Sequence, residues 1–86
     1  MFMEENKIYE ETKIEIINFI AETLGKEAET ITPETSINDI SDDSIQLFEL
    51  LLAFEKYYDV ETAYDDVVNL NTVEDIIQYT IQITSD

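Results

Sequence analysis

The stretch "SDDSIQLFELLLAFEKYY", residues 41–58, decides the fold because it joins a helix-start signal to a helical pattern of apolar residues. One set of apolar residues falls at i, i+3, i+4, i+7 and i+11, the spacing of a single helix face: Leu47, Leu50, Leu51, Phe54 and Tyr58. A second stripe, about 100° around the helix, consists of Ile45, Phe48 and Leu52. We expect the first face in the core. The second stripe is surplus to that core and is expected to face outward.

The start of this helix contains two residues that compete for one structural role. Serine is a common helix N-cap, but Asp43 is well placed as the cap, with Gln46 completing a capping box. Ser44 is then left at the first helical position, beside the unpaired amides of the first turn. These amides favour an attached phosphate by roughly 0.3–1 kcal/mol. Asp42 and Asp43 oppose such an anion by a comparable amount, so the position of Ser44 matters more than any stabilisation.

A helix is also predicted from Lys7 to Leu24, with Ile16, Ile20 and Leu24 on its apolar line and the chain's single glycine, Gly25, ending it. Residues 26–43 are rich in Thr, Ser, Asn and Asp and contain the single proline. Three isolated apolar residues recur within them: Ile31, Ile37 and Ile40. This composition predicts a long loop that is pinned to the core at intervals.

The C-terminal third is expected to contain a short helical turn around residues 64–68 and a longer last helix. Asn71, with Glu74 three residues later, predicts an N-cap and capping box that open "TVEDIIQYTIQI", residues 72–83. The residues expected to face inward are Val73, Ile76, Ile77 and Thr80 or Ile81. The tail "IIQYTIQIT" is β-branched and partly alternating, so local propensity alone would equally allow a strand.

Length and composition favour one small helical domain. The chain has 86 residues, 44% of them hydrophobic, with 1 Gly, 1 Pro and no Cys. So few turn-forming residues are typical of helical proteins rather than of sandwiches or barrels. We therefore expect residues 1–86 to form one all-α domain, a small four-helix bundle with three main helices, one short helix and a long loop between the first two.

The charge balance excludes several classes of function. The chain has 21 acidic residues against 4 lysines, with no histidine, and its net charge is −17. Such a charge repels nucleic acids and anionic membranes and attracts basic protein surfaces. Without His or Cys the usual general base, thiol nucleophile and metal ligands are missing, so we expect no enzyme and no metal site. The opening "MFMEENKIYEE" lacks the apolar segment of a secretory signal, so a cytoplasmic protein is expected. We also expect the protein to be a monomer.

The stretch "DDSIQLFELLLAFEKYYDVE" resembles the Asp-Ser-Leu motif and second helix of acyl carrier proteins. The resemblance extends to "IINFIAETLG", "SINDISDDSI" and "NLNTVEDIIQY", so it covers most of the chain. It implies that Ser44 bears a 4′-phosphopantetheine arm derived from coenzyme A, that Asp43 is the aspartate preceding the attachment serine, and that acyl groups are held on the arm as thioesters. Fatty acid, polyketide and related lipid synthesis are the pathways implied.

The resemblance also implies partners. A phosphopantetheinyl transferase would add the arm, and enzymes with basic patches would dock on the second helix. The matching docking positions in this chain are Ile45, Phe48, Glu49, Leu52 and Glu55. The alternative for Phe48 and Leu52 is that their side chains pack in the core instead of binding a partner. The chain departs from the usual family pattern in several places, which favour a specialised rather than a housekeeping carrier: Ser41 in place of glycine, a loop one residue shorter, Thr62 and Ala63 in place of Ile-Pro, and Lys56 at a commonly acidic position.

Three other hypotheses remain open from the sequence. An aminoacyl or peptidyl carrier shares the serine motif, although "SDDSI" in so acidic a chain favours acyl groups. An interaction module of the same fold would never be modified at Ser44. A calcium-binding EF-hand loop beginning at Asn38 would place Glu49 at position 12, but it has Ile40 at position 3 and Asp43 where glycine is needed.

Overall fold

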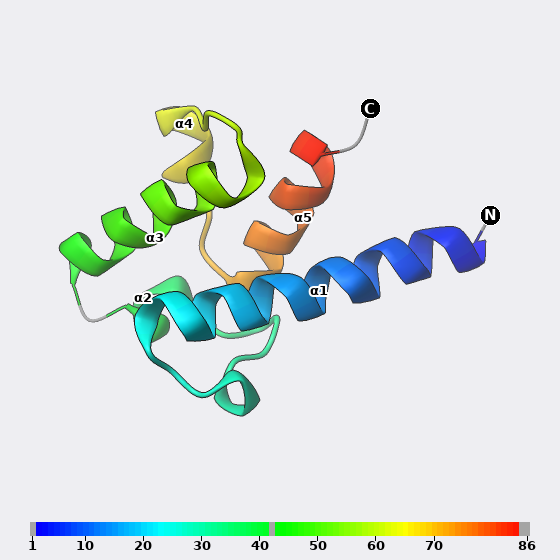
Figure 1. Ribbon diagram of the computed structural model, residues 1–86, viewed down its shortest axis with the longest axis horizontal. Coiled ribbons are helices and arrows are strands. Elements are labelled where there is room, and N and C mark those ends of the chain that lie inside the picture. Colours follow the sequence, from blue (N-terminus) through cyan, green and yellow to red (C-terminus); the bar gives the residue numbers. More distant parts are fainter. Residues whose placement is uncertain (1, 42, 85–86) are drawn as a thin grey trace.

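The computed structural model describes residues 2–41 and 43–84, with side chains described for residues 7–41, 43–63 and 65–84. Three long helices dominate the described chain: α1 (Phe2–Leu24), α3 (Ser44–Tyr58) and α5 (Val73–Thr84). Two four-residue helices, α2 (Ile37–Ile40) and α4 (Tyr64–Val67), and the 3-10 turn η1 (Ala28–Thr30) lie between them. Helix α1 packs against α3 and α5, and its N-terminal part extends beyond both (Figure 1). The predicted all-α class is confirmed.

The core forms where the three long helices meet. Its buried side chains include Ile16 and Ile20 of α1, Leu50 and Phe54 of α3, and Ile77 of α5. Within the expected α3 face, Leu47, Leu51 and Tyr58 are half-buried beside these. The helical spacing therefore identified the inward face of each long helix correctly.

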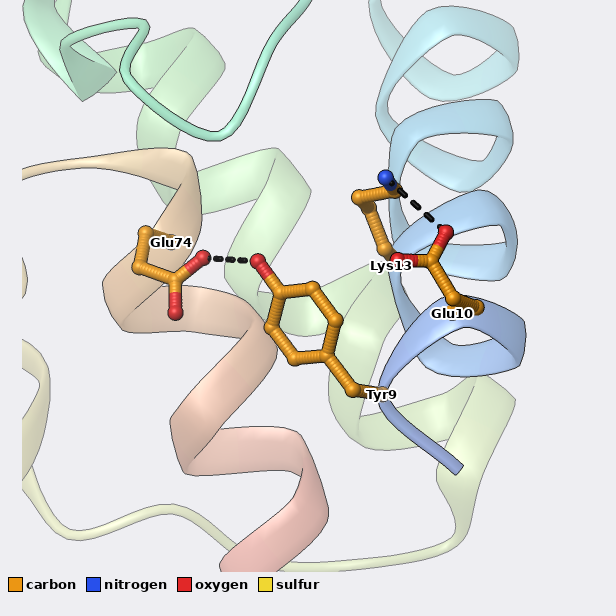
Figure 2. Close-up of polar contacts among 4 residues, drawn as sticks. All are labelled: Tyr9, Glu10, Lys13 and Glu74. Atoms are coloured by element: carbon orange, nitrogen blue, oxygen red, sulfur yellow. Dashed lines mark hydrogen bonds and ion pairs between the residues drawn. The ribbon is translucent and has the colours of Figure 1, made fainter. Parts of the chain in front are cut away.

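Helix α1 is longer than predicted, because it begins at Phe2 rather than at Lys7. The added residues contain no proline or glycine, so their sequence does not interrupt a helix. One tertiary contact holds the N-terminal half of α1, because the hydroxyl of Tyr9 donates to Glu74 of α5; within α1 itself, Lys13 pairs with Glu10 (Figure 2). At its other end α1 stops at Gly25, which has a left-handed φ of 68°, as the sequence predicted.

The long loop is anchored as predicted, since Ile31, Ile37 and Ile40 are all buried. It also contains α2, which the sequence did not reveal, and it crosses the start of α5. There the backbone carbonyls of Pro33 and Thr35 accept from the N–H groups of Glu74 and Val73, at 2.8 and 2.9 Å. These groups are among the four that a helix cannot pair internally, so the loop completes the N-terminus of α5.

The start of α5 corrects the sequence prediction. Thr72, rather than Asn71, is the N-cap: its hydroxyl accepts from the N–H of Asp75, and Asp75 accepts from the N–H of Thr72, both at 3.2 Å. Asp75 also accepts from the N–H of Asn71 at 2.9 Å. Glu74, the predicted box partner, instead binds Tyr9 and Gln78. The strand alternative for this segment is wrong, because residues 73–84 form a helix.

Candidate functional site

Ser44 is the first residue of α3, and its side chain is exposed. Asp43 before it has an extended backbone, and its carboxylate accepts from the N–H of Gln46 at 2.9 Å. The predicted N-cap is therefore confirmed. Ser44 is not needed for capping, and its hydroxyl stands at the helix end where backbone N–H groups have no intrahelical acceptor. Asp42, predicted to oppose an anion here, lies outside the described residues.

The backbone ahead of this site tolerates a serine where the resemblance led us to expect glycine. Ser41 has φ −116° and ψ 135°, an extended conformation open to any residue. It ends α2, and its hydroxyl donates to the carbonyl of Ile37 at 3.1 Å. The replacement of glycine by Ser41 therefore introduces no strain at the approach to Ser44.

The surplus stripe of α3 lies on the surface, as predicted. The exposed fractions are 69% for Ile45, 59% for Phe48 and 49% for Leu52, and Glu49 beside them is also exposed. Three large apolar side chains on successive turns, next to Ser44 and flanked by a carboxylate, form a surface that favours contact with another protein.

Glu55 differs from the other four predicted docking residues because it is engaged within the chain. Its carboxylate accepts from both the N–H and the hydroxyl of Thr62, each at 2.8 Å. Both bonds lower the pKa of Glu55, and the bond from the backbone N–H of Thr62 has the larger effect. The carboxylate thereby ties the end of α3 to the loop that leads into α4.

A groove of about 590 Å³ opens beside Ser44 and runs between α3 and the elements that face it. Its walls are mostly apolar and come from α2, α3, α4, α5 and the connecting loops, with Leu47, Leu51, Phe54, Val67, Leu70 and Ile76 among the lining residues. Phe54 at its inner wall packs edge-on against Phe19, with ring centroids 6.4 Å apart. Sequence reasoning missed the groove because its walls come from segments far apart in the chain.

Two other features, a metal site and a membrane-spanning helix, are absent from the described residues. Among the side chains described, those of residues 7–41, 43–63 and 65–84, no three acidic groups gather closely enough to hold a metal ion. In residues 2–41 and 43–84, no helix is both long enough and apolar enough to cross a bilayer.

Comparison with known proteins identifies the family. A family model described as "Phosphopantetheine attachment site" matches residues 15–80. The acyl carrier protein of Syntrophobacter fumaroxidans is 38% identical over 68 residues, which cover 78% of this chain and 84% of that protein. The acyl carrier protein of Syntrophus aciditrophicus is 42% identical over 65 residues, covering 74% and 81% of the two chains.

The chain belongs to the acyl carrier protein family. It is a non-catalytic carrier, and its prosthetic group is 4′-phosphopantetheine. The chemistry of the site suits this group in two respects. An exposed primary hydroxyl is available at Ser44 for a phosphodiester, and the first turn of α3 offers N–H groups to its phosphate.

Proposed function

We propose that Ser44 is the attachment residue of this carrier and that acyl groups are its cargo. The observation that supports this most strongly is the pairing of Asp43 with Gln46, because it caps the helix and leaves the neighbouring serine exposed at the first helical position. When bound, 4′-phosphopantetheine supplies a terminal thiol that holds an acyl group as a thioester. This carrier, which contains no cysteine, has no thiol of its own.

The groove beside Ser44 supports acyl groups over aminoacyl groups as cargo. Its apolar walls would shelter a hydrocarbon chain from water, which is favourable by about 0.8 kcal/mol for each buried methylene. An aminoacyl group would bring an ammonium group, which is costly to bury in such a site. We therefore propose a role in fatty acid, polyketide or related lipid synthesis.

The exposed stripe supports a proposal for the partners. Ile45, Phe48 and Leu52, with Glu49 beside them, combine apolar contact area with negative charge next to Ser44. A phosphopantetheinyl transferase and acyl-handling enzymes with basic docking patches match this chemistry. We further propose that these encounters take place in the cytoplasm and that the carrier acts as a monomer.

Mass spectrometry tests the attachment site. Incubation of the chain with coenzyme A, magnesium and a permissive phosphopantetheinyl transferase should add one phosphopantetheine, and Ser44→Ala should abolish the adduct. Ser41→Ala is the matched control, because Ser41 lies three residues earlier and should not affect modification. An unmodified wild-type chain, or an adduct retained in Ser44→Ala, would contradict the proposal. Intact-mass analysis of the protein from its own host would then identify the cargo.

A further inference from the structure

A second cleft lies between α1 and the C-terminal end of α3. Its volume is about 560 Å³, and it combines two kinds of side chain. Ile14, Phe19 and Tyr57 give it an apolar floor and walls, whereas Glu11, Glu15 and Glu22 place carboxylates around them.

The apolar part of this cleft is open to solvent. Ile14 and Tyr57 are each 57% exposed, although both are large hydrophobic side chains. Phe19 between them is half-buried, and its ring centroid lies 5.2 Å from that of Tyr57. The ring of Tyr57 is also 4.8 Å from that of Tyr58, whose hydroxyl donates to Glu15 at 2.6 Å. The aromatic side of the cleft is therefore held in place before any partner arrives.

This cleft shares Phe19 with the groove beside Ser44 but lies away from Ser44 itself and from the exposed stripe of α3. Tyr57 follows Ser44 by 13 residues along α3, which is roughly 20 Å of helix at 1.5 Å per residue. Tyr57 also lies about 120° around the helix from Ile45, since each residue turns the helix by about 100°. A protein bound over the stripe of Ile45, Phe48 and Leu52 therefore does not need to cover the cleft.

The local charge of the cleft is negative. All three of its glutamates are exposed. The lysine nearest to Glu11 and Glu15 in the sequence is Lys13, which lies roughly 160° around α1 from both. Lys13 instead pairs with Glu10 at 3.0 Å, on the flank of α1 that carries Tyr9 (Figure 2). Acidic groups thus border the apolar floor.

These features restrict the chemistry of the occupant. A second copy of a chain with net charge −17 would be repelled, as would a nucleic acid or an anionic bilayer. An apolar floor with a carboxylate rim is instead complementary to a helix that presents apolar residues flanked by Lys or Arg, the usual arrangement of a helix bound in a groove.

We propose that the cleft between α1 and α3 is a second docking surface, which binds a basic amphipathic helix of a partner protein independently of Ser44. This inference goes beyond the proposed carrier function. A carrier with two such surfaces can stay bound to one protein through α1 while Ser44 and its stripe face another.

A peptide titration tests this surface on the full chain. The probe is a synthetic amphipathic helix with Leu and Trp on one face and Lys and Arg on the other, and its control is a scrambled peptide of the same composition. Binding should shift the backbone NMR signals of Ile14, Asn18 and Tyr57. Ile14→Ser should weaken binding about tenfold, as expected for a central apolar contact. The double variant Glu11→Gln/Glu22→Gln should weaken it severalfold, with a smaller dependence on salt.

Matched variants separate this surface from the proposed attachment site. Ile45→Ser removes an exposed isoleucine from the α3 stripe and should leave affinity for the peptide at the cleft unchanged, as should Ser44→Ala. Failure of Ser44 modification would therefore leave this inference standing. Signal shifts confined to Ile45, Phe48 and Leu52 would overturn it, and so would an unchanged affinity in Ile14→Ser. Dimerisation of the free chain that is lost in Ile14→Ser would also overturn it, by showing that a second copy is the occupant.

Discussion

Glu55 and Thr62 form a two-point hydrogen bond across the turn that follows α3. One carboxylate oxygen of Glu55 accepts from both the N–H and the hydroxyl of Thr62, each at 2.8 Å. Thr62 lies where the family resemblance led us to expect isoleucine, and it also lines the groove. This chain thus closes the loop between α3 and α4 with a polar contact at a position where an apolar residue is usual.

This contact predicts a local response to acid. Its bonds lower the pKa of Glu55, so the stability it provides is present above the ordinary pKa and is lost as pH falls through the lowered one. We expect Glu55→Gln to speed hydrogen exchange at the Thr62 amide at neutral pH. In this variant the protection of that amide should also change less as the pH falls. NMR-detected exchange between about pH 7 and about pH 3 measures both effects. Glu61→Gln, an exposed neighbour, is the control. Equal exchange in wild type and Glu55→Gln would contradict the prediction.

The cap at Asp43 predicts separate effects on stability and modification. Asp43→Ala should lower the free energy of unfolding by about 1 kcal/mol, because the N–H of Gln46 loses its acceptor. Asp43→Asn should retain most of that stability, since asparagine caps a helix comparably. Urea denaturation measures the stability, and mass spectrometry measures the rate of phosphopantetheine addition. If Asn restores stability but not modification, the charge of Asp43 acts in recognition; if both variants unfold at the wild-type midpoint, the cap has no energetic role.

The sequence predicted those parts of the fold that depend on local chemistry. Gly25 ends α1 because glycine readily takes the left-handed conformation, and Asp43 opens α3 because its carboxylate reaches an amide three residues ahead. Helix α3 ends at Tyr58, the last residue of the stretch that the sequence predicted as helical. The left-handed conformation of Asp59 after it, with φ 55°, was not predicted, because aspartate only tolerates this conformation and does not require it.

Errors arose where tertiary contacts decided the outcome. Local propensity left the last segment undecided between helix and strand, whereas the carbonyls of Pro33 and Thr35 complete the N-terminus of a helix there. The sequence predicted Asn71 as the cap of α5, whereas Thr72 caps it, and Thr72 is also the residue that pairs with Ser36 of the crossing loop. The groove could not be predicted for the same reason, because its walls come from segments that meet only in the folded chain.

The exposed stripe predicts a contrast between neighbouring residues of α3. Ile45→Ala and Phe48→Ala should change the free energy of unfolding by only about 0.5 kcal/mol, as is usual for surface positions. Leu50→Ala should cost about 2–5 kcal/mol, because Leu50 is only 5% exposed within the core. Thermal or urea denaturation compares the three variants. A cost for Phe48→Ala close to that of Leu50→Ala would assign Phe48 to the core instead of the docking surface.

The contact between Tyr9 and Glu74 predicts a loss of stability in alkali. The hydrogen bond to Glu74, together with burial, raises the pKa of Tyr9 from 10.0 to about 12. Its stabilisation is therefore complete below about pH 10 and is lost as pH rises toward 12. Tyr9→Phe should show a smaller fall in unfolding free energy between about pH 9 and about pH 11.5. Part of the fall in unfolding free energy should remain in Tyr9→Phe, because burial and the hydrogen bond to Glu15 also raise the pKa of Tyr58. An unchanged fall would show that Tyr9 is not involved.

The excess of acidic residues predicts that salt stabilises the fold. With 21 carboxylates and 4 lysines on a molecule of 40 × 29 × 20 Å, most carboxylate pairs repel one another across the surface. Raising ionic strength from about 0.01 M to about 0.15 M shortens the Debye length from about 30 Å to about 8 Å, so it screens most of these pairs. A resulting gain on the order of 1 kcal/mol corresponds to an increase in Tm of about 4–8 °C. Calorimetry at the two salt concentrations measures it. The double variant Glu11→Gln/Glu22→Gln should begin with a higher Tm at low salt and gain less from added salt. A gain at least as large as in wild type would mean that these two side chains do not contribute to the repulsion.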